Sequence, residues 1–278
     1  MLTGTTKLAG VIGWPVGHSR SPRLHGYWLE SYGIDGAYVP LAVPPEHVAR
    51  ALRALPVLGF RGVNVTVPHK QAALTAVDEA DSHARRIGAV NTVVVGDDGR
   101  LLGSNTDGFG FIENLAAASP DWRRDRTAVI LGAGGASRAI IVALIDAGVP
   151  EIRIANRTES RARTLADEFA GPCSVVAWES RAEGLETAGL LVNTTTLGMS
   201  GAPTLGITLD GLPSDAVVTD IVYTPLITPL LESAAARGLQ AVDGLGMLLH
   251  QARPGFAAWF GREPEVTEAL RAFVLEDL

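Results

Sequence analysis

Three small residues with the spacing of a dinucleotide-binding turn follow a predicted strand. Gly132, Gly134 and Ser137 occupy the positions of a G-x-G-x-x-G/A motif between the apolar run TAVIL and a helical stretch. Small residues let the backbone approach a pyrophosphate, and the helix N-terminus supplies NH groups and positive potential for its charge. Ser137 is a departure, since glycine or alanine is usual there. The motif favours a bound dinucleotide over a merely tight turn.

The end of the next predicted strand indicates which dinucleotide. NAD-binding folds usually place an acid about 20 residues after the turn, where it accepts hydrogen bonds from the ribose 2′-hydroxyl. Here the strand EIRIAN ends in Asn156, Arg157 and Thr158, so no carboxylate repels a 2′-phosphate. The planar guanidinium group of Arg157 adds paired hydrogen-bond donors for that phosphate. Arg161, four residues further on, can lie on the same helical face. Solvated surface charge is the alternative for both arginines, but their place after the glycine turn favours NADP.

A lysine stands where a helix disfavours a cation. The stretch GVNVTVPHK reads as a half-buried strand followed by Pro68 at the first position of a helix, which places Lys70 in the first turn. The helix dipole then penalises Lys70 by about 0.3–1 kcal/mol unless an acid compensates. This stretch alone fits a functional lysine and a solvated one equally well. His69 is expected to be a partly exposed neighbour rather than a second base.

Further polar residues stand where the predicted strands of the first half end. They occur in GHSRSP, in NVTVPHK, at Asn91 and in SNTDG. Ligands of open α/β sheets bind in crevices at such strand ends. Taken singly, each residue has a structural explanation: Ser21 before Pro22 would make an ordinary helix N-cap, and Asp107 could cap the helix that follows it.

Alternating apolar runs and helical stretches predict an α/β fold. In the first half we expect strands at 7–13, 37–43 and 62–67, helices at 21–33, 44–56 and from Pro68 onward, and a hairpin within 88–108. In the second half we expect strands at 127–131, 151–156, 188–196 and 216–223, a helix after the glycine turn, and helices at 107–119, 243–261 and 267–278. Pro254 should kink or interrupt the helix at 243–261.

At 278 residues, the chain is long enough for two hydrophobic cores. We predict an N-terminal, mostly parallel α/β substrate domain over residues 1–106, completed by the C-terminal helices 244–278. Residues 107–243 are predicted to form a Rossmann-type NADP-binding domain, with a cleft between the two domains.

Composition excludes several classes of function. The formal net charge of −7 argues against nucleic acid as the main partner, and no apolar run reaches the roughly 20 residues of a membrane span. Cys173 is the only cysteine, so no internal disulfide forms. The six histidines lack a metal-binding spacing, so no metal is predicted. The N-terminus lacks the charged and apolar regions of a signal peptide, which makes the cytoplasm the expected location.

A series of motifs in fixed order resembles the shikimate dehydrogenase family over nearly the whole chain. The series is GWPVGHSRSP, NVTVPHK, GAVNTV, GSNTDGFG, GAGGASRA, ANRT, VNTTTLGM and DGLGMLLHQA. The resemblance implies reversible NADPH-dependent reduction of 3-dehydroshikimate to shikimate in aromatic amino-acid biosynthesis. It also implies a small-molecule substrate and a monomer or homodimer.

The resemblance further implies roles for individual residues. Lys70 and Asp107 would be the pair at the reacting oxygen, with Lys70 transferring the proton and Asp107 supporting it. The substrate carboxylate would be held by Ser19, Ser21 and Tyr223. The ring hydroxyls would be surrounded by Thr66, Lys70, Asn91, Asp107 and Gln251. The pyrophosphate would face Gly132, Gly134, Gly135 and Ala136. The adenosine phosphate would be held by Asn156, Arg157, Thr158 and Arg161. The nicotinamide would lie near Ile221, Gly244 and Met247.

Two alternatives stay open. The first is an enzyme of the same fold that acts on quinate or an aminoshikimate, possibly with NAD. Ser19 and Ser21, together with the run from Asn156 to Thr158, favour shikimate and NADP instead. The second is a non-catalytic shikimate-sensing protein, against which the presence of both Lys70 and Asp107 argues.

Overall fold

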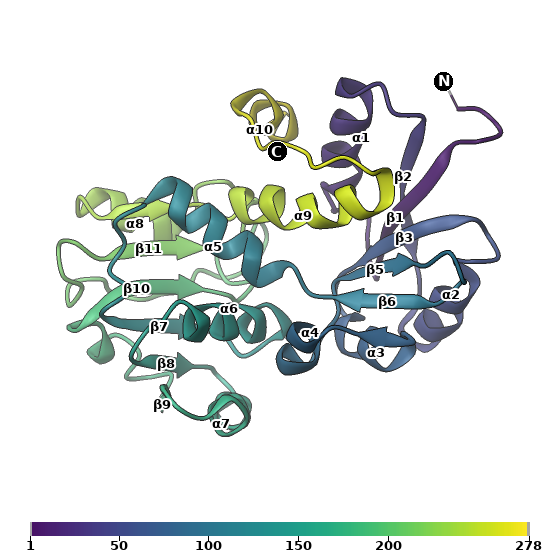
Figure 1. Cartoon of the computed structure of the whole chain (residues 1–278). Coiled ribbons are helices and arrows are strands. Elements are labelled where there is room, and N and C mark those ends of the chain that lie inside the picture. The colour runs from purple at the N-terminus through teal and green to yellow at the C-terminus, as the bar shows by residue number, and fades with distance from the viewer. Residues whose placement is uncertain (1, 277–278) are drawn as a thin grey trace. The chain divides into compact units, whose positions relative to one another are not determined.

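The computed structural model describes residues 2–276 and divides into two compact units (Figure 1). The first unit runs through Asp107 and resumes at Leu248, and the second comprises Gly108–Met247. The divisions fall within helix α5 (Asp107–Ala118) and helix α9 (Leu245–Phe260). Each unit is built on its own β-sheet, so the predicted two-domain α/β class is confirmed.

The sheet of the first unit is mixed. Its strands, in spatial order, are β2 (Gly36–Ala42), β1 (Lys7–Gly13), β3 (Phe60–Val65), β5 (Thr92–Val95), β6 (Leu101–Ser104) and β4 (Glu79–Ala80). Strand β5 is antiparallel to both of its neighbours, whereas the other pairings are parallel. The predicted hairpin is formed by β5 and β6, with Val95 opposite Leu101.

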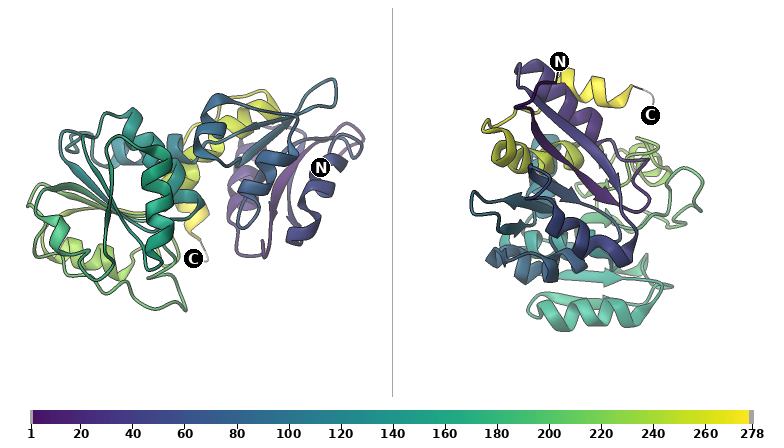
Figure 2. Two further views of the ribbon diagram at one scale, coloured as in Figure 1. Left: turned by 90° about the horizontal axis from the view of Figure 1, so that it is seen from below. Right: turned by 90° about the vertical axis from the view of Figure 1, so that its right-hand side faces the viewer.

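Helices cover both faces of this sheet (Figure 2). They are α1 (Ser21–Ser31), the short 3₁₀ turn η1 (Pro45–His47), α2 (Val48–Ala54), α3 (Lys70–Ala76), α4 (Ser82–Ile87), the main part of α9, and α10 (Glu268–Leu275). On one face, Ile12 and Val65 of the sheet pack with Leu52 of α2 and Ala73 of α3. Successive residues of a strand point to opposite faces, and Tyr38 of β2 pairs with Ala9 of β1, which is three residues from Ile12. Tyr38 therefore lies on the other face of the sheet.

That second face carries a layer of aromatic rings. His25 of α1 stacks on Tyr38 of β2, with 3.9 Å between the ring centroids and 4° between the ring planes. Phe256 and Trp259 of α9 and Trp28 of α1 complete the cluster. The rings come from segments more than 200 residues apart, so this layer joins helix α9 to the N-terminal sheet.

Two local expectations near Lys70 were wrong. Pro68 does not begin a helix: α3 begins at Lys70, and the residues before it form a turn in which the His69 backbone N–H donates to the Thr66 carbonyl at 2.9 Å. His69 is only 1% exposed, because its Nε2 donates to the backbone carbonyl of Val43 at 2.8 Å and draws the ring inward.

Pro254 does not interrupt its helix, since α9 continues through it to Phe260. A proline removes one backbone hydrogen bond from a helix interior. The residues that follow it, Phe256 and Trp259, are buried in the aromatic layer. Tertiary packing therefore outweighs the tendency of Pro254 to end the helix.

The sheet of the second unit is entirely parallel. Its order is β12 (Gln240–Val242), β11 (Val217–Asp220), β10 (Ala188–Asn193), β7 (Thr127–Leu131), β8 (Ile152–Ala155) and β9 (Cys173–Val176). From β7 the chain adds β8 and β9 on one side and then crosses to add β10, β11 and β12 on the other. This order is that of a dinucleotide-binding Rossmann fold, whose ligand crevice lies where the strand order reverses, beside β7 and β10.

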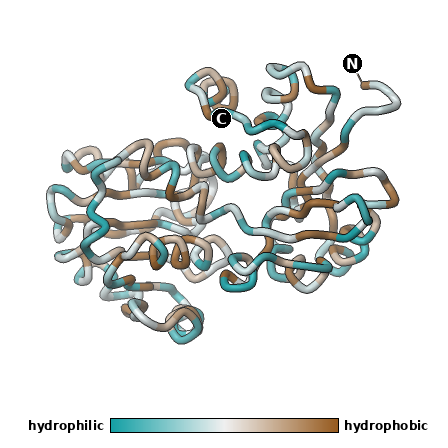
Figure 3. The backbone as a smooth tube through the Cα atoms, viewed as in Figure 1, coloured by the Kyte–Doolittle hydropathy of each residue, from teal (hydrophilic) through white to brown (hydrophobic). Residues whose placement is uncertain are grey.

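Apolar residues are frequent along these strands (Figure 3). Their side chains form two cores on opposite faces of the second sheet. The remaining helices are α6 (Gly135–Asp146), α7 (Glu159–Phe169), α8 (Pro229–Ala236) and the 3₁₀ turn η2 (Glu183–Leu185). Ile130 packs on the face covered by α5, α6 and α7, whereas Leu131 packs on the face covered by α8. Continuous burial along β7 explains its uninterrupted apolar sequence.

Within residues 2–276 no helix has the length and apolar character needed to cross a membrane. The same residues contain no group of three or more histidine, cysteine, aspartate or glutamate side chains arranged to hold a metal ion.

Candidate active site

Lys70 and Asp107 meet in the first unit. Lys70 is the first residue of α3 and Asp107 the first residue of α5, and Lys70 Nζ lies 2.5 Å from Asp107 Oδ2. The lysine side chain is 17% exposed and the aspartate side chain 7% exposed. The acid that Lys70 needs at its helix N-terminus is therefore Asp107, which is itself well placed at the positive end of α5. A partly shielded amine and carboxylate in contact can hold and move a proton.

The Asn91 side chain fixes the carboxylate from the other side. Its Nδ2 donates to Asp107 Oδ1 at 2.8 Å and to Thr106 Oγ1 at 3.1 Å. Its Oδ1 accepts the Thr106 backbone N–H at 2.9 Å. Because a backbone N–H only donates, this contact sets the orientation of the amide and turns its nitrogen toward Asp107.

Gln251, on α9, joins the same cluster. Its Oε1 lies 3.4 Å from Asn91 Nδ2, and its Nε2 donates to the Leu248 carbonyl at 3.1 Å. The hydroxyl of Thr106 donates to the Gln251 backbone carbonyl at 2.8 Å. Lys70, Asn91, Asp107 and Gln251 are thus brought together, although they come from four separate segments of the chain.

Three of the four predicted hydroxyl residues follow the neighbouring parallel strands β1 and β3. Ser19 lies in the loop after β1, and its Oγ accepts the backbone N–H of Ser21, the buried first residue of α1, at 3.3 Å. Thr66 follows β3, and its backbone N–H donates to the Ile12 carbonyl of β1 at 2.9 Å. Tyr223 lies in the second unit, in the loop after β11.

Several buried polar residues around the cluster are not among the predicted site residues. Asn105 Oδ1 accepts the backbone N–H of Asp107 at 3.0 Å, and Asn105 Nδ2 donates to the Ala89 carbonyl at 2.9 Å, so this side chain holds the start of α5. The run SNTDG contains Asn105, but Ser, Asn, Asp and Gly are also the usual residues of turns, so the sequence does not single out this side chain.

Asn64 was missed for a different reason. The Tyr38 hydroxyl donates to Asn64 Oδ1 at 2.6 Å, and Asn64 Nδ2 donates to the Asn91 carbonyl and to Thr92 Oγ1, both at 3.2 Å. The alternation in β3 predicts a solvent-facing residue, but the aromatic layer covers that face and leaves Asn64 only 5% exposed. No local sequence pattern predicts that aromatic side chains cover this face of the sheet.

The glycine turn of the second unit has the geometry of an anion site. Gly132 has φ +116°, and a Cβ there would lie 2.4 Å from Thr194 Oγ1, so only glycine fits. Gly134 and Gly135 face open space, and the first N–H groups of α6, including that of Ala136, have no partner within the helix. These residues therefore fit a pyrophosphate.

Ser137, the departure from the glycine motif, is accommodated in this turn. It is fully buried, its Oγ accepts the Gly134 backbone N–H at 3.0 Å, and it lies 2.6 Å from Thr194 Oγ1. The small hydroxyl thus replaces a methyl group without leaving a polar atom unpaired.

At the end of β8, two guanidinium groups lack protein partners. Arg157 and Arg161 are exposed, and neither side chain has a hydrogen bond or ion pair within residues 2–276. Asn156 Nδ2 and the Arg161 backbone N–H both donate to the Thr158 carbonyl, at 2.8 and 3.0 Å, which shapes the turn into α7. Guanidinium groups that have no protein partner suit a phosphate ester.

Ile221, Gly244 and Met247 are also brought together. A Cβ on Gly244 would lie 2.4 Å from the Ile221 carbonyl oxygen, and Ile221 and Met247 belong to one apolar cluster. The Ile221 backbone N–H donates to the Asn193 carbonyl at 3.1 Å. The three residues therefore form an apolar surface at the carboxyl ends of β10 and β11.

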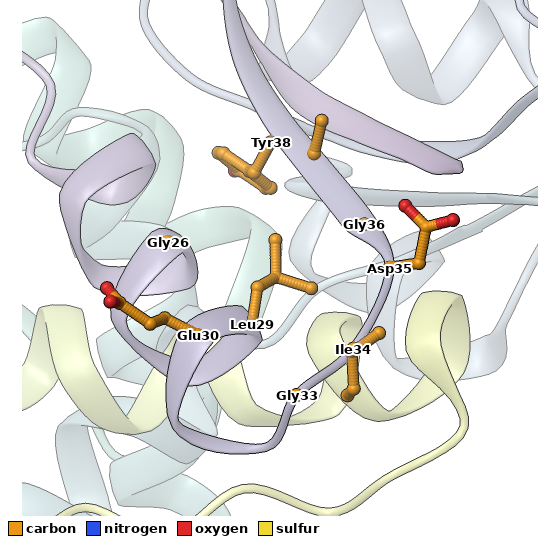
Figure 4. Close-up of a pocket in the computed structure, with 9 residues that line it drawn as sticks. Gly26, Leu29, Glu30, Gly33, Ile34, Asp35, Gly36 and Tyr38 are labelled. Carbon is orange, nitrogen blue, oxygen red and sulfur yellow. The ribbon is translucent and has the colours of Figure 1, made fainter. Parts of the chain in front are cut away.

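A separate pocket of about 570 Å³ lies elsewhere in the first unit, between the end of α1 and the start of β2 (Figure 4). Leu29 and Tyr38 border it, and the carboxylates of Glu30 and Asp35 point outward on opposite sides (Figure 4). Asp35 Oδ1 accepts a hydrogen bond from the Thr6 hydroxyl at 2.6 Å. None of the predicted site residues lines this pocket.

Two family models match most of the chain. The model described as the shikimate dehydrogenase substrate binding domain matches residues 11–93, and that described as shikimate / quinate 5-dehydrogenase matches residues 114–198. The chain belongs to the shikimate dehydrogenase family. The family resemblance predicted from the motifs is therefore confirmed.

Individual members of the shikimate dehydrogenase family are similar over their full length. The shikimate dehydrogenase (NADP(+)) of Paramagnetospirillum magneticum is 62% identical over 275 residues, which cover 99% of this chain and 100% of that protein. The solved structure of shikimate 5-dehydrogenase from Thermus thermophilus, in complex with NADP(H) and shikimate, is 38% identical with a TM-score of 0.86 and covers 98% of this chain and 100% of its own. Quinate dehydrogenase from Corynebacterium glutamicum, in complex with NAD, is 33% identical with a TM-score of 0.90 and covers 97% and 99%.

Proposed function

We propose that this chain catalyses the reversible NADPH-dependent reduction of 3-dehydroshikimate to shikimate, a step of aromatic amino-acid biosynthesis. The observation that carries the proposal is the Lys70–Asp107 contact, held by Asn91 within the unit that matches the substrate-binding family model. A relative named as an NADP(+)-dependent shikimate dehydrogenase, similar over its full length, supports the same reaction.

We assign the substrate-binding roles by the chemistry of the side chains. Ser19 and Ser21, with Tyr223, offer hydroxyl donors to a carboxylate. Thr66, Asn91 and Gln251 offer both donors and acceptors to ring hydroxyls. The placement of Asn91 and Gln251 beside Asp107 supports this assignment, because a ring bound there would present its hydroxyls to the amine and carboxylate.

The proton step belongs to Lys70. NADP, when bound, accepts a hydride from the carbinol carbon in the oxidation direction and supplies one in the reverse direction. The hydroxyl proton leaves at the same time, and the neutral amine of Lys70 accepts it. Asp107 orients the amine and balances the ammonium charge that forms, while Asn91 keeps the carboxylate in place. In the reduction direction Lys70 returns the proton to the carbonyl oxygen.

We assign NADP to the second unit. Gly132, Gly134, Gly135 and Ala136 would hold the pyrophosphate, and Asn156, Arg157, Thr158 and Arg161 the adenosine phosphate. Ile221, Gly244 and Met247 would contact the nicotinamide. The free guanidinium groups, and the presence of Asn156 in place of an acid at the end of β8, support NADP over NAD.

An initial-rate assay tests the proposed reaction. Purified protein is given shikimate or quinate, crossed with NADP or NAD, and nicotinamide absorbance is followed. Shikimate with NADP should be fastest by a wide margin. A lead for quinate with NAD would favour the quinate dehydrogenase alternative, and an absence of turnover with every pair would favour the sensing protein.

Hydride transfer requires two separately bound ligands to meet with water excluded. We therefore propose that the ternary complex is more compact than the ligand-free chain, which small-angle scattering with both ligands would detect. The cleft between the domains, the monomeric or homodimeric state and the cytoplasmic location stay predictions.

A further inference from the structure

A buried hydroxyl adjoins the amide that holds the carboxylate of Asp107. Thr92 is the first residue of β5, is only 2% exposed and directly follows Asn91. Its Oγ1 lies 2.9 Å from Asn91 Oδ1 and 3.2 Å from Asn64 Nδ2. Thr92 and Asn64 are opposite residues of the antiparallel pair β5 and β3, which brings their side chains together on one face of the sheet.

The orientation of the Asn64 amide follows from its neighbours. The Asn91 backbone carbonyl only accepts, so the Asn64 nitrogen, 3.2 Å away, is the atom that faces it. The Asn64 oxygen then faces Tyr38, whose hydroxyl donates to it at 2.6 Å. Burial raises the pKa of the Tyr38 hydroxyl well above its usual value, although the Ser21 side chain opposes that rise, so Tyr38 keeps the proton that it donates. The other amide proton of Asn64 goes to Thr92 Oγ1.

The Thr92 hydroxyl has one proton, and its neighbours decide where that proton points. Because Asn64 Nδ2 donates to Thr92 Oγ1, the Thr92 proton goes to a different atom, and Asn91 Oδ1 accepts it at 2.9 Å. Asn91 Oδ1 also accepts the Thr106 backbone N–H at 2.9 Å. The Thr106 hydroxyl lies 3.2 Å from the same oxygen but donates to the closer Gln251 carbonyl, at 2.8 Å. The two lone pairs of Asn91 Oδ1 are therefore used by Thr106 N–H and by Thr92.

These hydrogen bonds form a chain in which every member donates toward the carboxylate. The chain runs from Tyr38 through Asn64, Thr92 and Asn91 to Asp107. Hydrogen bonds that follow one another in this way polarise each other inside a protein. Two donors on its oxygen also hold the Asn91 amide more firmly than one, with the nitrogen 2.8 Å from Asp107 Oδ1.

We propose that Thr92 is a positioning residue for the proton step, because its hydroxyl holds Asn91 in the orientation that keeps Asp107 directed at Lys70. The inference deepens the proposed function and rests on its assignment of the proton step to Lys70 and Asp107. Thr92 acts through Asn91 and not on the substrate.

Two variants separate the hydroxyl of Thr92 from its packing. Thr92→Val keeps the shape of the side chain and removes the proton donor, whereas Thr92→Ser keeps the hydroxyl and removes a methyl group. In Thr92→Val, kcat for shikimate with NADP should fall on the order of tenfold, because the buried Asn91 Oδ1 loses one of its two donors. In Thr92→Ser, kcat should stay within about twofold of the wild-type value. A residue that serves packing alone would give the reverse order.

Thr127→Val is the matched control. Thr127 is likewise buried and begins a strand, β7, but it lies at the amino end of that strand, away from the ligand edge of the second sheet. Its hydroxyl donates to Glu151 Oε2 at 3.0 Å, so the variant also loses a hydrogen bond. Its kcat should stay at the wild-type value. A fall as large as that in Thr92→Val would show that a general loss of stability lowers kcat, and the inference would be wrong.

Calorimetric titration with NADP shows whether each variant is folded. The Thr92 variants should bind NADP as tightly as the wild type, because the groups assigned to the cofactor lie in the second unit. If Thr92→Val does not bind NADP, Thr92→Ala replaces it, since alanine differs from serine at this position by the hydroxyl alone.

The outcomes distinguish this inference from the proposed function. A wild type that does not turn over shikimate with NADP would overturn the proposed function and, with it, the role of Thr92. An active wild type whose kcat is unchanged in Thr92→Val, or is reduced more by serine than by valine, would overturn the role of Thr92 alone.

Discussion

The charged side chains of the proposed site are paired with each other in the first unit and unpaired in the second. In the first unit, Lys70 and Asp107 neutralise each other at 2.5 Å and Asn91 holds the carboxylate. In the second unit, the guanidinium groups of Arg157 and Arg161 have no partner among residues 2–276. The protein itself thus holds the reacting groups in place. The two guanidinium groups assigned to the cofactor, in contrast, have no protein partner and are available to a charged ligand. We therefore expect substitutions in the first unit to affect turnover and those in the second to affect cofactor binding.

The largest effect should follow from Lys70→Met. Without the amine, the hydroxyl proton has no acceptor, so kcat should fall by about 10²- to 10⁴-fold while KM for shikimate changes far less. Steady-state kinetics on shikimate and NADP give both values. Lys7→Met is the matched control, because Lys7 is the only other lysine in the sequence and its Nζ donates to the Phe260 carbonyl at 3.3 Å, away from the Lys70 cluster. A loss confined to KM would reduce Lys70 to a binding residue.

The next effect concerns cofactor choice. Arg157→Ala combined with Arg161→Ala should raise KM for NADP by at least about tenfold, because charge-assisted hydrogen bonds to the phosphate are lost. KM for NAD should change little. Arg163→Ala is the control, since Arg163 lies on α7 with Arg161 but already pairs with Glu159. Equal losses for NADP and NAD would remove these arginines from phosphate recognition.

A smaller effect is expected on stability at the glycine turn. Gly132→Ala and Gly148→Ala both introduce strain, since both glycines have positive φ, but only the Cβ at position 132 would overlap a neighbour, Thr194 Oγ1. Gly132→Ala should therefore lower the free energy of unfolding by about 1–3 kcal/mol more than Gly148→Ala. Urea unfolding measures the difference. Equal losses of unfolding free energy in the two variants would show that the turn can relax and that no close contact requires glycine at position 132.

A further effect on stability is a pH dependence in the aromatic layer of the first unit. Burial lowers the pKa of His25 from 6.5 to about 3, against the opposing effect of Asn64. Between these values the unfolded chain binds the proton and the folded chain does not, so the stability present above pH 6.5 is lost as pH falls. The slope from this group is at most about 1.4 kcal/mol per pH unit.

His25→Phe should flatten that dependence, because a phenyl ring keeps the stacking on Tyr38 and carries no proton. Urea unfolding between pH 4 and pH 7 gives the comparison. His47→Asn, at an exposed position, should leave the slope as in the wild type. An unchanged slope in His25→Phe would mean that other groups set the acid stability.

The sequence predicts best where one local signal decides the structure. Continuous apolar runs between turn residues locate β7 and β10, and two strand-like runs on either side of Asp97 to Gly99 locate the β5–β6 hairpin. Strands β9 and β12, which are only four and three residues long, were not predicted. Short edge strands acquire their form from pairing with a neighbour, and the sequence carries little periodic signal for that.

The same limit applies to the site. The glycine turn and the arginines after β8 can be found from spacing alone, because each is local. The burial of Asn64 and His69 depends on contacts with segments far away in the sequence, Tyr38 and Val43. The meeting of Lys70 with Asp107 likewise joins two helix starts that are 37 residues apart. Only the order of several motifs, taken together, predicts that pairing.

A structure of this chain determined with both shikimate and NADP bound would test the central claim most directly. We predict that the reacting hydroxyl lies within hydrogen-bond reach of Lys70 Nζ and Asp107, with the carboxylate at Ser19 and Ser21. Shikimate bound away from this cluster, for example in the pocket between α1 and β2, would contradict the account.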